Sequence, residues 1–182
     1  MVDPASGPFL FDTSAESWLA LSQDAAVRKW LRAYLAQHQV HVSSVTVLER
    51  VRGYALLWRA ATPERRVHIE SARVAYLREF GRVWAVDAGI AVVAAEIMAL
   101  VPEPPSPPRR THRLAESSQE RLVRWRLDAI IASTALVAGM PLIHNNPTDF
   151  EAIRGAIEIS PRRFPGLGPL NLRRCGQLLE VS

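Results

Sequence analysis

Residues 127–150, LDAIIASTALVAGMPLIHNNPTDF, decide the fold of this chain. The segment runs from Asp128 through small and apolar residues to Gly139, where a helix is expected to end. Residues 141–143 then form a short apolar strand, and polar residues follow it directly. A helix that leads into a short buried strand is typical of a parallel sheet with helices on both faces.

The same alternation of helices and short strands recurs along the rest of the chain. Periodicity and capping signals predict helices at residues 25–37, 44–58, 63–80, 88–100 and 117–139. Short apolar runs predict strands at residues 7–11, 40–43 and 83–86, and a last edge strand at residues 157–159. The sequence therefore predicts an α/β fold, a three-layer α/β/α sandwich with a short, mainly parallel central sheet.

One segment departs from this alternation. Residues 101–118, VPEPPSPPRRTHRLAESS, form an insertion rich in proline and arginine, and its prolines exclude a regular helix. We expect a loop or flap there, and an irregular tail from about residue 160. With 182 residues, the whole chain, residues 1–182, is expected to fold as one domain.

Charge and cysteine content narrow the class of protein. The net charge is +4, and almost all of the positive charge is arginine, because Lys29 is the only lysine. Arginine binds phosphate through its forked guanidinium, so a nucleic-acid partner is one interpretation and genome composition is the other. Cys175 is the only cysteine, which excludes an intrachain disulfide and a cysteine-rich zinc site. We expect a cytoplasmic protein with no membrane partner, because no apolar run and no signal-like segment indicates otherwise.

Acids follow two of the predicted strands. Asp12 comes directly after the first strand, where a buried carboxylate is unfavourable unless it is paired or binds a metal ion. Capping of the next helix is the alternative interpretation of Asp12. Asp149 and Asn146 follow the fourth strand, and turn formation is their alternative.

Two further acids lie on predicted helices. Asp128 shares a helix face with Trp125 and Ile131, so it points toward the core. A buried salt bridge to Arg124 is the alternative for Asp128. Glu49 lies near the start of the helix after the second strand, and pairing with a neighbouring arginine is its alternative. Ligands in parallel sheets bind at the carboxyl ends of the strands, where these acids would meet.

Oxygen ligands without histidine or cysteine suit Mg²⁺ or Mn²⁺ rather than zinc. The five histidines show no metal-ligand spacing, and we interpret them as structural or surface residues, although His144 stands out because it lies next to the predicted site in the sequence. The sequence therefore predicts a centre for a hard divalent cation at the strand ends.

Three segments resemble the motifs of PIN domains. FLFDTSAESWL, residues 9–19, resembles their opening strand, which ends in Asp-Thr-Asn or Asp-Thr-Ser. SSVTVLERVRG, residues 43–53, resembles their second motif, with a Glu and then a Gly. Residues 127–150 resemble the third and fourth motifs, in which Asp opens a run of small residues and Asn-x-x-Asp-Phe follows a strand. The resemblance covers about residues 9–159.

The resemblance implies a set of site residues. Asp12, Glu49, Asp128 and Asp149 would bind the Mg²⁺ or Mn²⁺ ion and act in catalysis, with Ser14 and Asn146 as supporting groups. The fourth acid of the family falls either at the position of Asn146 or at the Asp of Asn-x-x-Asp. Because position 146 is an asparagine here, we expect Asp149 to complete the site.

The resemblance also implies a function, that of the VapC-like toxins of type II toxin–antitoxin pairs. These are metal-dependent endoribonucleases that pair with a small antitoxin and commonly dimerise. RNA, an antitoxin and a second copy of the chain are therefore the expected partners. Five arginines in or beside the insertion are expected to contact RNA, with ion pairs to nearby acids as the alternative: Arg109, Arg110, Arg113, Arg121 and Arg124.

Two other functions stay open from the sequence. One is a PIN-like nuclease for RNA processing or DNA ends, which would act without an antitoxin. The other is a degenerate PIN-like domain that binds RNA or a protein partner without catalysis. Asn146 and the unusual insertion keep the second interpretation open.

Overall fold

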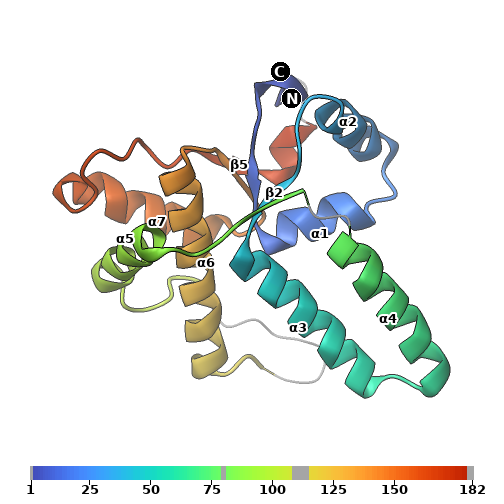
Figure 1. Ribbon diagram of the computed structural model, residues 1–182. Coiled ribbons are helices and arrows are strands. Elements are labelled where there is room, and N and C mark those ends of the chain that lie inside the picture. The colour runs from blue at the N-terminus through green and yellow to red at the C-terminus, as the bar shows by residue number, and fades with distance from the viewer. Residues whose placement is uncertain (1, 79–80, 108–114, 180–182) are drawn as a thin grey trace.

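One parallel sheet organises the chain (Figure 1). The computed structural model describes residues 2–78, 81–107 and 115–179. Within them the sheet has five strands in the order β3-β2-β1-β4-β5, and every neighbouring pair is parallel. The strands are β1 (Leu10–Phe11), β2 (His41–Ser43), β3 (Arg82–Trp84), β4 (Leu142–His144) and β5 (Leu172–Arg174). The predicted fold class is confirmed, and the sheet is entirely parallel.

Helices cover both faces of this sheet. They are α1 (Thr13–Leu21), α2 (Ala25–Leu35), α3 (Ser44–Ala60), α4 (Pro63–Arg78), α5 (Ala88–Leu100), α6 (Ser118–Ala138) and α7 (Pro147–Ile159), with short 3-10 turns at Pro4–Ser6, Pro161–Arg163 and Cys175–Leu178. Leu10 and Leu142 belong to the core formed with α5, α6 and α7. Phe11 and Ile143, the next residues along the same strands, belong to a second core with α1 and α2. Side chains alternate between the faces of a strand, so two cores and three layers result.

Local signals set the ends of the central helix. Ser117 and Glu120 form a capping box at the start of α6, because each side chain accepts a hydrogen bond from the other residue's backbone N–H. Gly139 ends the helix in the left-handed conformation, with φ of 64°. Met140 and Pro141 then lead into β4. The predicted helix and strand of this segment are confirmed within a few residues.

The end of the chain differs from the prediction. Residues 157–159, predicted as an edge strand, are the last turn of α7. The buried residues Phe150, Ile153 and Ile157 are spaced as on one helix face, so the helix continues to the end of this run. The fifth strand is β5, which lies in the tail that we expected to be irregular. Its residues are partly or fully exposed, so it carries little apolar signal, and pairing with β4 determines it.

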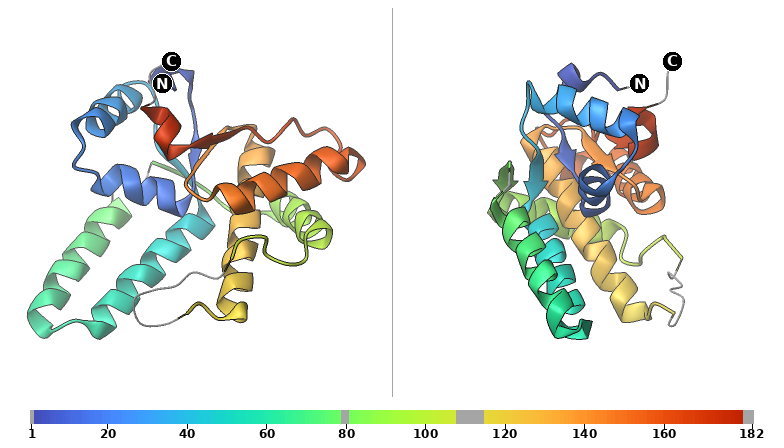
Figure 2. Two further views of the ribbon diagram at one scale, coloured as in Figure 1. Left: turned by 180° about the vertical axis from the view of Figure 1, so that it is seen from behind. Right: turned by 90° about the vertical axis from the view of Figure 1, so that its right-hand side faces the viewer.

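Helices α3 and α4 form a hairpin that extends away from the sheet (Figures 1 and 2). Every residue of α4 is at least partly exposed. Arg50 joins this hairpin to α1 through an ion pair with Glu16, at 3.0 Å, and its guanidinium lies against the rings of Tyr54 and Tyr76. No helix in the described part of the chain is both long and apolar enough to cross a membrane.

The insertion is described in part. Residues 101–107 and 116–117 contain neither helix nor strand, as expected for a proline-rich segment. Arg109, Arg110 and Arg113 lie outside the described residues.

Gly81 provides a test of the sheet's packing. A β-carbon at this position would lie 2.0 Å from the carbonyl oxygen of Val40, which accepts the hydrogen bond of Arg82 at the start of β3. We expect Gly81→Ala to lower the free energy of unfolding by about 1–3 kcal/mol, measured by urea denaturation. The control is Gly53→Ala in α3, where the added carbon meets no atom within 4 Å. Alanine favours helix, so this control should be neutral or raise stability by up to about 1 kcal/mol. Equal effects of the two substitutions would contradict the packing of β3 against Val40.

Candidate metal centre

Asp12 lies at the carboxyl end of β1 and caps α1. Its carboxylate accepts hydrogen bonds from the backbone N–H of Ala15 at 2.6 Å and from the hydroxyl of Ser14 at 2.8 and 2.9 Å. The helix cap, which was the alternative interpretation of Asp12 from the sequence, is therefore present, and metal binding by the same carboxylate stays a prediction. The side chain is 3% exposed, and burial raises the pKa of Asp12 from 3.8 to about 6 although these hydrogen bonds oppose the shift. Repulsion by Glu49 adds to the shift.

Asp128 projects from α6 toward the same strand ends. Burial raises its pKa well above the ordinary value, and repulsion by Asp12, Asp149 and Glu49 raises it further. A hydrogen bond from the side-chain N–H of Asn146, at 2.9 Å, opposes the shift. The three other predicted acids thus lie near enough to Asp128 to disfavour its ionisation. The structure brings together the acids that the sequence separates.

Glu49 reaches the centre from α3. It is half-buried and accepts a hydrogen bond from the hydroxyl of Thr13, the first residue of α1. The neighbouring Arg50, a possible partner from the sequence, pairs instead with Glu16. Thr13 was not singled out by sequence reasoning, although its place directly after Asp12 in the first motif was a usable signal.

Asp149 is completely buried in the first turn of α7. Its carboxylate accepts hydrogen bonds from the backbone N–H and hydroxyl of Ser106, both at 3.1 Å, and from the side chain of Asn146 at 2.6 Å. Arg124 donates a further bond at 2.9 Å and also holds Glu116, at 3.0 and 3.1 Å. Sequence reasoning missed Ser106, because a serine among prolines carries no signal of its own.

Of the arginines predicted to bind RNA, the structure describes Arg121 and Arg124, which lie in different surroundings on α6. Arg124 makes the ion pair that we considered as the alternative to RNA contact, with Glu116, and a second one with Asp149. Arg121 lies one turn earlier on α6 and is partly exposed. A hollow of about 810 Å³ lies between α3 and the first half of α6, and Glu49, Arg52, Gln119 and Arg124 are among its lining residues. Contact of Arg121 and Arg124 with RNA stays a prediction.

The donor set fits a hard divalent cation. Within the described ranges, no three histidine, cysteine or acidic side chains are close enough to hold an ion as they stand. The acids nevertheless supply oxygen atoms only, and repulsion among them contributes to the raised pKa values of Asp12 and Asp128. A cation between these carboxylates would offset that repulsion and draw them together. Asp12, Glu49 and Asp128 would hold it.

His144, at the end of β4, lies beside this centre and is fully buried against the ring of Phe150, with 4.8 Å between the ring centroids. Burial lowers the pKa of His144 from 6.5 to about 4, so the ring is neutral at physiological pH. This agrees with its interpretation as a structural residue.

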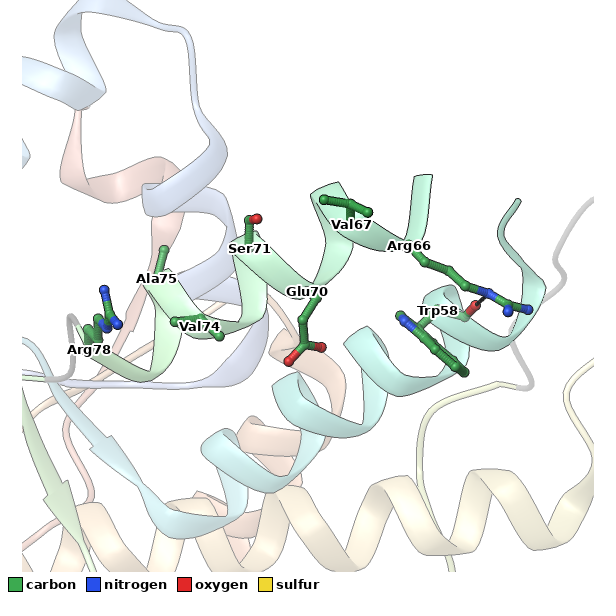
Figure 3. A pocket seen from close by; sticks show the side chains of 8 residues that line it. All are labelled: Trp58, Arg66, Val67, Glu70, Ser71, Val74, Ala75 and Arg78. Carbon is green, nitrogen blue, oxygen red and sulfur yellow. Dashed lines mark hydrogen bonds between the residues drawn. The ribbon is translucent and has the colours of Figure 1, made fainter. Parts of the chain in front are cut away.

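A second hollow, of about 590 Å³, lies on the α3–α4 hairpin (Figure 3). Trp58 and Val67 contribute apolar surface to it, and Arg66 lies over the ring of Trp58 and donates a hydrogen bond to its carbonyl oxygen. The acids of the candidate centre do not line this hollow.

The class of protein follows from this fold and site. The PIN domain family model matches residues 9–156, and the chain belongs to the PIN domain family. The resemblance stated from the sequence motifs is confirmed.

Solved structures share the fold at low sequence identity. The VapBC2 structure from Rickettsia felis, bound to a promoter DNA fragment, is 14% identical, with a TM-score of 0.58 over 91% of this chain and 97% of that one. A FitAB structure bound to the IR36 DNA fragment is 21% identical, with a TM-score of 0.59 over 96% and 98%. The FitAcB structure from Neisseria gonorrhoeae is 24% identical, with a TM-score of 0.54 over 80% and 93%. A search of curated proteins found no match.

The raised pKa of Asp12 predicts how the stability of the fold depends on pH. Above about pH 6 the folded protein must carry a buried charge that the unfolded chain carries freely, so ionised Asp12 destabilises the fold. Asn also caps helices, so Asp12→Asn should raise the free energy of unfolding by about 1–3 kcal/mol at pH 7.5 in chelator. The gain should disappear toward pH 4, where the carboxylate of Asp12 is protonated in the folded state.

The matched control is Asp24→Asn, the same substitution at the exposed cap of α2. It should change stability little across this pH range. Chemical denaturation at several pH values measures both variants. Loss of stability in Asp12→Asn at pH 7.5 would contradict the electrostatics of the centre.

Proposed function

We propose that this PIN domain is a metal-dependent endoribonuclease. Its acidic centre would consist of Asp12, Glu49, Asp128 and Asp149, with Ser14 and Asn146 in support. The observation that carries this proposal is the raised pKa of Asp128, which burial raises most and which the three other acids of the set raise further by repulsion. Such clustering at strand ends is unfavourable for folding and is typical of functional sites. The cation would be Mg²⁺ or Mn²⁺.

The acids of the centre and their hydrogen-bond partners have distinct roles in this proposal. The α1 cap fixes the Asp12 carboxylate at the end of β1, and Thr13 orients Glu49. Asp128, with its raised pKa, is suited to accept a proton from a water molecule at its carboxylate oxygen. The ion, when bound, lowers the pKa of water and offsets negative charge on the phosphoryl oxygens.

The hollow between α3 and α6 supports an RNA substrate. It borders Glu49, and Arg52 brings positive charge to its wall, while Arg124 and Glu116, which also line it, form an ion pair. Phosphate groups that enter it would meet guanidinium groups on the way to the acids. Arg121 is proposed to contact RNA from the same end of α6, together with the three arginines that lie outside the described residues.

A protein partner is part of the same proposal. The chain shares its fold with the VapBC2 and FitAB structures, which supports a small antitoxin as partner and a cytoplasmic toxin. Apolar side chains are exposed on the α3–α4 hairpin, among them Leu56, Leu57 and Trp58. A protein surface, either that of an antitoxin or that of a second copy of the chain, would cover them.

The second candidate is a PIN domain that binds RNA or a protein without catalysis. The ion pair between Asp149 and Arg124 favours it, because that carboxylate is already neutralised within the protein. The two candidates differ in whether bound metal leads to cleavage.

Cleavage of mixed RNA, including transfer RNA, tests the proposal. With Mn²⁺ or Mg²⁺ the purified protein should give discrete fragments, and chelator should abolish them. Asp12→Asn and Asp128→Asn should each reduce the cleavage rate by about 100-fold or more. Loss of a group that only supports a metal ligand already costs up to about 100-fold, and these two residues are proposed ligands. The control Asp24→Asn should cleave like the wild type, because it alters an exposed cap. A folded, metal-binding wild type that leaves all RNA intact would favour the second candidate.

A further inference from the structure

The side chain of Asn146 lies between two carboxylates. Its amide nitrogen donates hydrogen bonds to Oδ2 of Asp128 at 2.9 Å and to Oδ2 of Asp149 at 2.6 Å. A primary amide nitrogen carries two N–H groups, so these carboxylates use both of them. They also fix the orientation of the amide, because its oxygen would be repelled by either carboxylate. Neither of these two contacts uses the amide oxygen, which can therefore face another partner.

The carboxylate of Asp149, in contrast to the amide oxygen of Asn146, accepts several hydrogen bonds from protein groups. Its Oδ2 accepts from Asn146, from the Ser106 hydroxyl and from Arg124, and its Oδ1 accepts from the Ser106 backbone. Each carboxylate oxygen offers about two lone-pair sites, so Oδ2 with its three donors is fully occupied, while Oδ1 with one donor keeps one site. To bind a cation through Oδ2, Asp149 would have to give up one of these donors, and binding through either oxygen would bring the cation near the guanidinium of Arg124. Both changes are unfavourable in a fully buried site.

We propose that Asn146 supplies the fourth ligand through its amide oxygen and that Asp149 is a positioning residue behind it. This inference rests on the proposed metal centre and divides the roles within it. Amide oxygens are ordinary ligands of hard divalent cations. Asp149 holds the amide by accepting one of its N–H groups, and Arg124 neutralises Asp149. The first shell then has three carboxylates and one neutral oxygen.

The proline-rich insertion takes part in this arrangement. Ser106 lies between Pro105 and Pro107, and its backbone N–H and hydroxyl both reach Asp149. Prolines restrict the backbone on either side, so Ser106 is held at low entropic cost. At the other end of the insertion, Glu116 receives two hydrogen bonds from Arg124. The described ends of the insertion, at Ser106 and Glu116, thus surround Asp149 and Arg124.

Cysteine substitution with Cd²⁺ as the probe tests which side chain reaches the ion. A thiolate in contact with Cd²⁺ gives an ultraviolet charge-transfer band, and Cd²⁺ prefers such soft ligands. We expect the band for Asn146→Cys and not for the matched variant Asp149→Cys. The wild type, whose only cysteine is the buried Cys175, is the blank. Circular dichroism establishes that each variant is folded.

Mn²⁺ titration of the same proteins by calorimetry, without RNA, separates the possible failures. If the wild type binds no Mn²⁺, the proposed metal centre itself is wrong. If the wild type binds Mn²⁺ but the band forms only in Asp149→Cys, or in neither variant, the centre stands and this division of roles is wrong. The same conclusion follows if Asn146→Ala binds Mn²⁺ as tightly as the wild type.

A further variant tests the role of Asp149 without introducing a cysteine. Ser106→Ala removes one donor to Asp149 and should weaken Mn²⁺ binding by about 10-fold, as expected for an outer-shell group. The control Ser71→Ala, on the exposed face of α4, should leave the affinity unchanged. Unchanged affinity in Ser106→Ala would show that the Ser106 hydroxyl does not help to position Asp149 for metal binding.

Discussion

Electrostatic repulsion among carboxylates at the ends of parallel strands is the constraint on which the rest of this structure depends. Asp12 is buried and Asp128 half-buried there, both with raised pKa values, and Glu49 and Asp149 add to the repulsion at Asp128. A fold tolerates such a cluster only where neighbouring groups stabilise it. The α1 cap stabilises Asp12, the hydroxyl of Thr13 binds Glu49, and the amide of Asn146 lies between the other two acids.

Arg124 sets the balance of charge at this centre. It lies one helical turn before Asp128 on α6, yet it pairs with Asp149 and Glu116. The centre therefore has one acid that the protein neutralises itself and three that it leaves to be neutralised. That difference explains how the proposed site for a divalent cation and an ion pair could lie side by side. Arg124 also connects Glu116, in the described part of the insertion, to Asp149.

The sequence predicted what local signals encode. The spacing in residues 127–150 contains a helix, its glycine end and a buried strand, and the structure confirms all three. Strand β5 could not be predicted, because its exposed residues form a strand only through pairing with β4. The four acids could be named from the sequence, but the partners of Asp149 could not, since Ser106 and Arg124 reach it through tertiary packing. Propensities and spacing carry no information on such long-range partners.

The most direct measurement is a crystal structure of the full chain grown with Mn²⁺, with anomalous scattering used to locate the ion. We predict one strong peak within coordination distance of carboxylate oxygens of Asp12 and Asp128, with Glu49 facing it. Such a peak would show that the repulsion at the strand ends exists to bind a cation. A peak elsewhere, or acids that stay paired only with protein groups at saturating Mn²⁺, would contradict the metal centre.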